Sequence, residues 1–234
     1  MQVSAVRLTE VGAGIRRIDL RIGDFDLWYE VPPELPLTEG GEFAVCAGLL
    51  PAMARGETLV LPASLPIDDT FRHNIDLVQN QLLEWQDYLQ MSISRIDIDA
   101  APRTGPAPVR DGALSFFSGG VDGSYTALIN RDRIGALVLL RGIDMQLTNE
   151  ELWADALVSG QRLASHWRMP FAAVATNVRF LGYHYGFKWS RHFQGAGLAS
   201  VAHLIPFREA LIAASYALED SPPLGSHPAL DPLW

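Results

Sequence analysis

The sequence predicts an α/β protein in which a small α+β unit, residues 1–100, is followed by a parallel-sheet unit, residues 111–234. The first observation is a proline-rich stretch that cannot continue a helix or a central strand and predicts a linker over 101–110. Secondly, strand-like and helix-like patterns alternate beyond this linker, which is typical of βαβ units and a parallel sheet. Thirdly, a glycine-rich turn at 118–123 lies between an apolar strand and the start of a helix.

The first unit is expected to contain a helix among short strands. Partial alternation of apolar residues or short apolar runs predict these strands at 16–22, 26–30, 58–61 and 95–99. An amphipathic helix ending near Trp85 is expected before the last of them, because apolar residues recur at helical spacing at Phe71, Ile75, Val78 and Leu82. No residue of this unit carries a recognisable chemistry, so we expect the site in the second unit.

In the second unit the apolar runs predict strands at 113–117, 136–141, 171–176 and 210–215. The intervening patterns predict helices at 124–130, 149–167 and 195–205. Thr148 and Glu151 have the spacing of a capping box at the start of the long helix. Because ligands of open α/β sheets bind outside the carboxyl ends of the strands, the residues that follow each strand are the candidates for a site.

Length and composition narrow the class of protein. The chain of 234 residues is 48% hydrophobic, which suffices for a buried core. No run approaches the apolar length of a membrane span, and the N-terminus lacks a signal-peptide pattern, so we expect a soluble cytoplasmic protein. The single cysteine, Cys46, excludes an intrachain disulfide and is expected to be buried. A net charge of -9 gives no general attraction for nucleic acid, which is therefore not an expected partner.

The turn Ser-Gly-Gly-Val-Asp-Gly at 118–123 is the most specific feature of the chain. Backbone N–H groups and the positive end of the following helix converge at such a turn, which predicts a phosphate site. A Walker A loop would need a lysine here, and a nucleophile elbow would need glycine in place of Phe116. The structural alternative is an ordinary turn in which Asp122 caps the helix.

The residues Ser118, Gly119, Gly120 and Asp122 resemble the Ser-Gly-Gly-x-Asp-Ser loop of the PP-loop ATP pyrophosphatases. With the tail Gly-Ser-His-Pro-Ala-Leu-Asp-Pro-Leu-Trp, they resemble a poorly characterised bacterial branch of that superfamily. The resemblance covers 113–234 and implies a Rossmann-like (HUP/PP-loop) nucleotide-binding domain that cradles the pyrophosphate of ATP. Relatives continue beyond the position of Trp234, so the resemblance also implies that this chain is shortened at its C-terminus.

The resemblance and the strand ends together define the expected site. Cofactor contacts are expected from Ser118, Gly119, Gly120, Val121, Asp122, Gly123, Ser124, Gly142, Asp144, Thr176, Asn177 and Gly195. The expected catalytic residues are Asp122, which would also hold Mg²⁺, and Arg179 and Lys188, which would neutralise the leaving pyrophosphate. The acceptor side of the site is expected at Ser215, His227 and Asp231.

Several of these expectations leave alternatives open. The family has serine where this chain has Gly123, and the neighbouring Ser124 is a candidate substitute. Asp144 would hold magnesium or a substrate amine, or only cap its loop. A loop-capping role is also open for His227 and Asp231.

Three functions follow as expectations. The first is ATP-dependent adenylation of a carboxylate or amide oxygen on a small-molecule acceptor, with release of pyrophosphate. A catalytically degenerate ATP-binding or regulatory module is the second, suggested by Gly123 and the end at Trp234. A tRNA-modifying enzyme is the third, disfavoured by the acidic charge and the lack of a cysteine pair. A homodimer is considered as the assembly, with Phe187 and Trp189 in a packed lid or dimer surface.

Overall fold

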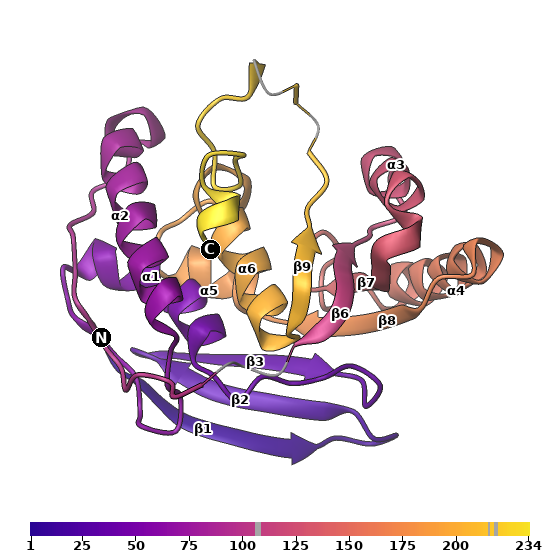
Figure 1. The fold of residues 1–234 in the computed structure, drawn as a ribbon, viewed down its shortest axis with the longest axis horizontal. Coiled ribbons are helices and arrows are strands. Elements are labelled where there is room, and N and C mark those ends of the chain that lie inside the picture. The colour runs from indigo at the N-terminus through magenta and orange to yellow at the C-terminus, as the bar shows by residue number, and fades with distance from the viewer. Residues whose placement is uncertain (106–108, 215, 218–219) are drawn as a thin grey trace.

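A single seven-stranded sheet runs through the chain in the order β1-β2-β3-β8-β7-β6-β9 (Figure 1). The computed structural model describes residues 1–105, 109–214, 216–217 and 220–234. Antiparallel strands form one side of this sheet and parallel strands the other, with helices packed against it. The protein is therefore mixed α/β, as the sequence predicts. Among the described residues no helix is both long and apolar enough to cross a membrane.

The antiparallel side is a meander of β1 (Val3–Glu10), β2 (Arg16–Ile22) and β3 (Phe25–Val31). β2 and β3 alternate buried and more exposed residues, as the sequence predicts for strands with one face on a core. β1 was not expected, because it is an edge strand in which only Val3 is buried. Its pairing with β2 is also interrupted between Ser4 and Arg7.

The parallel side contains β6 (Arg110–Phe116), β7 (Ile134–Arg141), β8 (Phe171–Thr176) and β9 (Phe207–Leu211), in the spatial order β8-β7-β6-β9. The predicted strands all exist, although β9 begins and ends earlier than expected. The chain moves from β6 outward to β7 and β8, then returns to place β9 on the other side of β6. The strand order therefore reverses at β6, where open α/β sheets bind their ligands.

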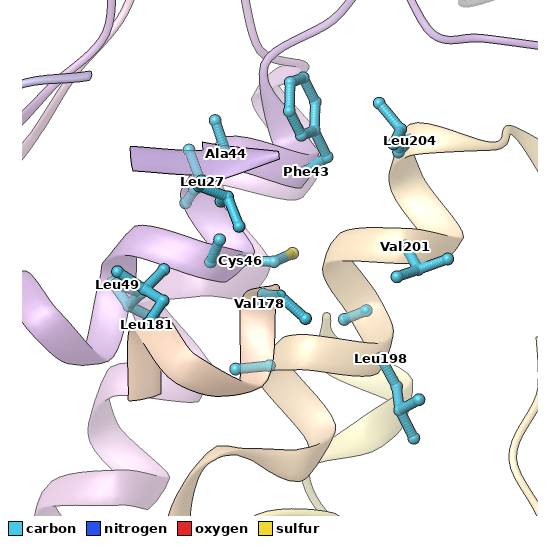
Figure 2. Close-up of a cluster of buried hydrophobic side chains, with 14 of the residues drawn as sticks. Leu27, Phe43, Ala44, Cys46, Leu49, Val178, Leu181, Leu198, Val201 and Leu204 are labelled. Atoms are coloured by element: carbon cyan, nitrogen blue, oxygen red, sulfur yellow. The ribbon is translucent and has the colours of Figure 1, made fainter. Parts of the chain in front are cut away.

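Helices cover both faces of the sheet. On one face α3 (Val121–Ile129) and α4 (Glu150–Trp167) bury a small cluster around Phe117, Ala127 and Ala164. The larger core lies on the other face, under α1 (Glu42–Arg55), α2 (Asp69–Leu89), α5 (Val178–His184) and α6 (Gln194–Leu204). Figure 2 shows Cys46 of α1 in this core among side chains of β3, α5 and α6, so its predicted burial is confirmed.

The remaining elements are short. They are the parallel pair β4 (Leu59–Val60) and β5 (Ile98–Asp99), the 3-10 turns η1 (Arg131–Arg133) and η4 (Asp231–Leu233), and the π-helix η2 (Trp189–Phe193). Phe187 and Trp189, considered for a lid or dimer surface, are buried in the core of this chain. The expected capping box is wrong, because α4 begins after Asn149, whose side chain accepts a hydrogen bond from the N–H of Leu152.

One sheet and one core span the expected boundary at 101–110. β3 of the first half pairs antiparallel with β8 of the second half, through Tyr29 and Thr176. The larger core also contains residues from both halves of the chain. Residues 106–108 of the expected linker lie outside the described residues. The N-terminal strands are thus an extension of the sheet that carries the glycine-rich turn.

Candidate functional site

The glycine-rich turn links the end of β6 to the start of α3. Gly119 has φ +81°, and no described atom lies within 4 Å of the position that a Cβ would take there. Glycine is therefore required by the backbone conformation rather than by a lack of space. The helix N-cap is Gly120, which has no side chain with which to cap the helix. Asp122 is consequently a first-turn residue of α3 rather than its cap. In this position the positive end of the helix dipole stabilises its negative charge.

A cavity of about 270 Å³ opens beside this turn. Its lining comprises Phe116, Phe117, Ser118, Gly120, Val121, Asp122 and Gly123 after β6, Val138, Leu140, Ile143, Asp144 and Met145 along and after β7, Gln194 and Leu198 of α6, and Ile212 and Ala213 after β9. The arrows of β6 and β9 point toward the same end of the sheet (Figure 1). The cavity thus lies at the carboxyl ends of the parallel strands, beside the strand at which their order reverses.

Asp122 and Asp144 are the only charged side chains among the described residues that line the cavity. Both are exposed, so both can reach a ligand that enters from solvent. The described part of the chain contains no group of three or more His, Cys, Asp or Glu side chains arranged to hold a metal ion. Two carboxylates still fit Mg²⁺, which commonly binds one or two carboxylates and completes its shell with phosphate oxygens and water.

Gly123 lines the cavity from the first turn of α3. A Cβ at this position would lie 3.8 Å from the carbonyl oxygen of Phe116 and 3.8 Å from the backbone nitrogen of Ser118, which are ordinary contact distances. The Cβ of a serine at this position would therefore make no close contact. Ser124 lies outside the lining, because consecutive residues of a helix point about 100° apart. Ser124 therefore does not occupy the position in the cavity that a serine at 123 would have.

The connection after β7 brings Asp144 to the cavity through a tight turn. Gly142 has φ +91°, and its N–H donates a hydrogen bond of 2.9 Å to the carbonyl oxygen of Met145. A Cβ on Gly142 would lie 1.9 Å from the carbonyl oxygen of Thr176, so only glycine fits here. Gly142 therefore shapes the turn and does not itself line the cavity.

The two cations expected to neutralise pyrophosphate lie outside the lining. The guanidinium of Arg179, in the first turn of α5, donates hydrogen bonds to the carbonyl oxygen of Ile143 and to the hydroxyl of Tyr183. Lys188 is an exposed residue that precedes η2, and its backbone N–H donates a bond of 3.1 Å to Nδ1 of His192. Neither Arg179 nor Lys188 is therefore among the residues that line the cavity.

Thr176 and Asn177 follow β8, but their side chains face β3. The hydroxyl of Thr176 donates a 2.8 Å bond to the carbonyl oxygen of Trp28. The amide of Asn177 accepts from the N–H of Trp28 and donates to the carbonyl oxygen of Asp26, each at 2.9 Å. These bonds hold the antiparallel strand β3 against β8. Contrary to the expectation from the sequence, neither residue lines the cavity.

Gly195 is close to the C-terminal tail and is not open to a phosphate. Its N–H donates a 2.7 Å hydrogen bond to the carbonyl oxygen of Gly225, and a Cβ would lie 2.2 Å from the same oxygen. The glycine is required because the tail approaches α6 this closely. Gln194, one residue earlier, and Leu198, one turn later, are the residues of α6 that line the cavity.

The tail residues expected on the acceptor side support the tail itself. Nδ1 of His227 accepts a 3.0 Å bond from the N–H of Ala229, and its ring packs edge-on against Trp85. Oδ2 of Asp231 accepts a 2.7 Å bond from the hydroxyl of Ser226. Oδ1 of Asp231 is buried and has no hydrogen-bond partner among the described residues. Neither residue lines the cavity, and Ser215 lies outside the described residues.

Asp231 predicts a pH dependence of stability. Burial raises the pKa of Asp231 above its ordinary value of 3.8, so the folded state holds this proton more tightly than the unfolded state. Stability contributed by the protonated carboxyl is complete below pH 3.8 and is lost as the pH rises through the folded-state pKa. We therefore expect Asp231→Asn to be more stable than the parent at neutral pH, with a gap that closes in acid. Thermal unfolding of both proteins from pH 3 to pH 8 measures this gap, and an equal loss of stability at every pH would contradict it.

Of the residues expected at the site, the structure thus brings Ser118, Gly120, Val121, Asp122, Gly123 and Asp144 together in one cavity. The apolar lining, which includes Ile143, Met145, Leu198 and Ile212, was not expected. Two of these flank Asp144 in the sequence, and a search of both neighbours of each candidate would have found them. Comparison of the chain with models of protein families, with curated proteins and with solved structures finds no match.

Proposed function

We propose that this cavity binds ATP with magnesium and that the protein adenylates a carboxylate or amide oxygen of a small molecule, releasing pyrophosphate. The observation that carries the proposal is the position of the turn 118–120, which places the start of α3, with Gly120 as its N-cap, at a cavity beside the strand-order reversal. A phosphate group is the ligand that such a helix start favours, because backbone N–H groups and the helix dipole act together on an anion.

In the proposed reaction, the bonds that form and break lie between ATP and the acceptor and do not involve the protein. The acceptor oxygen would form a bond to the α-phosphorus, while the bond from this phosphorus to the oxygen that bridges it to the β-phosphorus breaks. Pyrophosphate takes up the electron pair and leaves. The first turn of α3 would stabilise the charge on the leaving group through its N–H groups. The apolar lining, which includes Phe116, Leu140 and Leu198, would exclude water from the reacting atoms.

The charge of the cavity bears on how ATP would bind. Neither arginine nor lysine occurs among the described lining residues, whereas Asp122 and Asp144 are both acidic. Magnesium would supply the positive charge that lets a triphosphate approach two carboxylates. We therefore expect ATP binding to depend strongly on Mg²⁺, and Asp122 to be the residue whose loss weakens it most.

Pyrophosphate release tests the proposal directly. We expect the protein, incubated with ATP, Mg²⁺ and a pool of amino acids and other small carboxylates, to form AMP and pyrophosphate. Asp122→Asn should reduce this release by at least about 10–100-fold, which is the loss that substitution of even the outer partners of a metal commonly causes. Asp132→Asn is the matched control, because Asp132 is an aspartate of η1 whose side chain is 98% exposed and does not line the cavity. Formation of ADP and phosphate instead would contradict the proposal.

A second function is favoured by Gly123, which removes the hydroxyl that the resemblance places against phosphate. In that case the protein is an ATP-binding module without turnover. Calorimetry should then detect ATP binding in the presence of Mg²⁺ while the parent releases no pyrophosphate. The Cβ added by Gly123→Ser makes only ordinary contacts, so release that appears only in this variant would favour the binding module. Release by the parent would exclude it.

A further inference from the structure

Arg179 connects α5 to the turn that carries Asp144. Its guanidinium donates to the carbonyl oxygen of Ile143, which immediately precedes Asp144, across 36 positions of the sequence. Ile143 and Asp144 both line the cavity, whereas Arg179 does not. Arg179 therefore contacts the peptide group between Ile143 and Asp144 without itself lining the cavity.

The guanidinium is held in place by other contacts. Its Nε donates a 2.7 Å bond to the hydroxyl of Tyr183, one turn later on α5. Its central carbon lies 5.4 Å from the centre of the Tyr183 ring and 5.8 Å from that of Trp189, within the range of cation–π interactions. Trp189 is buried at the start of η2, so the cation is fixed against the packed part of the molecule. A planar guanidinium can make these contacts together, and a lysine cannot.

The hydrogen bond within the turn restrains only part of the backbone around Asp144. The hydrogen bond from Gly142 to Met145 closes the turn around Ile143 and Asp144, but it leaves the Ile143 carbonyl to find another partner. Ile143 is buried, and an unpaired buried carbonyl would cost free energy. A bond from a charged donor is stronger than one from a neutral donor, so Arg179 restrains this peptide group firmly.

We infer that Arg179 is a positioning residue that sets the Asp144 carboxylate at the cavity by fixing the Ile143 peptide group. The role of Asp144 toward magnesium and ATP rests on the proposed function, whereas the restraint of the turn by Arg179 does not. Arg179 would thus act through Asp144 and have no contact with phosphate, unlike the role that its sequence position suggests.

Hydrogen exchange of the protein without ATP tests the restraint. Arg179→Ala should speed amide exchange in the turn 142–146 by about tenfold, since local opening becomes easier, and leave the turn 118–120 unchanged. Arg179→Lys, which keeps the charge but not the stacked plane, should give an intermediate change. Arg191→Ala is the matched control, because Arg191 also donates to a backbone carbonyl, that of Tyr88, elsewhere in the fold. Unchanged exchange in both Arg179 variants would overturn the inference.

A double-mutant cycle then tests the route through Asp144, with the Kd of Mg²⁺-ATP as the readout. Arg179→Ala should weaken binding about tenfold in the parent and less than about twofold in Asp144→Asn. Equal losses in both backgrounds would mean that Arg179 acts directly or through general destabilisation, and would overturn the positioning role. If the parent binds no ATP, the proposed function fails, while the exchange experiment still decides whether Arg179 restrains the turn.

Discussion

Replacement of Arg103 by alanine is expected to lower the free energy of unfolding by about 3–5 kcal/mol, because it leaves a buried carboxylate without its counter-ion. Arg103 forms an ion pair with Glu42 in which the two side chains are only 17% and 5% exposed. Glu42 lies in the first turn of α1 and also accepts a 3.0 Å bond from the N–H of Asp68, the N-cap of α2. The pair therefore joins the segment before the second half of the chain to two helices of the first half.

Urea unfolding of the variant measures this loss, and a surface pair provides the comparison. Arg208 and Asp111 form an ion pair whose side chains are 66% and 90% exposed, so Arg208→Ala should cost less than about 1 kcal/mol. Replacing Glu42 and Arg103 together by apolar residues should recover part of the loss, because no unpaired charge remains. If Arg103→Ala and Arg208→Ala lowered the free energy of unfolding by the same amount, the burial of the Arg103–Glu42 pair would not explain its contribution.

The alternation of strand and helix predicted most of the second half correctly. Parallel strands buried on both faces are continuous apolar runs, as in Leu137–Leu140, and such runs are easy to recognise. Two of the missed elements, β1 and α1, lack such a recognisable pattern. β1 is a largely exposed edge strand, and α1 is buried on nearly all sides, so neither shows the one-sided pattern from which elements are predicted.

The candidate site was predictable where it is local and unpredictable where it depends on pairing between distant segments. The turn 118–120, Asp122 and Asp144 follow strands directly, and the parallel sheet brings them together. Thr176 follows a strand in the same way, yet β3 lies against β8. The backbone of β3 forms a hydrogen bond with the Thr176 hydroxyl, which is therefore not available to the cavity. The sequence contains no local signal for this antiparallel addition, nor for the contact of Arg179 with Ile143.

Gly142→Ala is expected to have the second large effect, since it combines an unfavourable backbone conformation with a direct clash. At φ +91° a Cβ costs about 1–2 kcal/mol. The same Cβ would lie 1.9 Å from the carbonyl oxygen of Thr176, and the shift that relieves this overlap should cost about 1–3 kcal/mol more. We expect a total loss of about 2–5 kcal/mol, together with displacement of Asp144.

Gly186→Ala separates these two causes. Gly186 has φ +85°, and no described atom lies within 4 Å of its Cβ position, so the control carries the backbone cost without the clash. Urea unfolding should therefore show a smaller loss for Gly186→Ala. Calorimetry under conditions in which both variants remain folded should show weaker Mg²⁺-ATP binding for Gly142→Ala alone, because Gly186 lies outside the cavity lining. If the two variants lose the same stability, then the approach of Thr176 does not constrain the turn, and the placement of Asp144 depends on the Arg179 contact more than on Gly142.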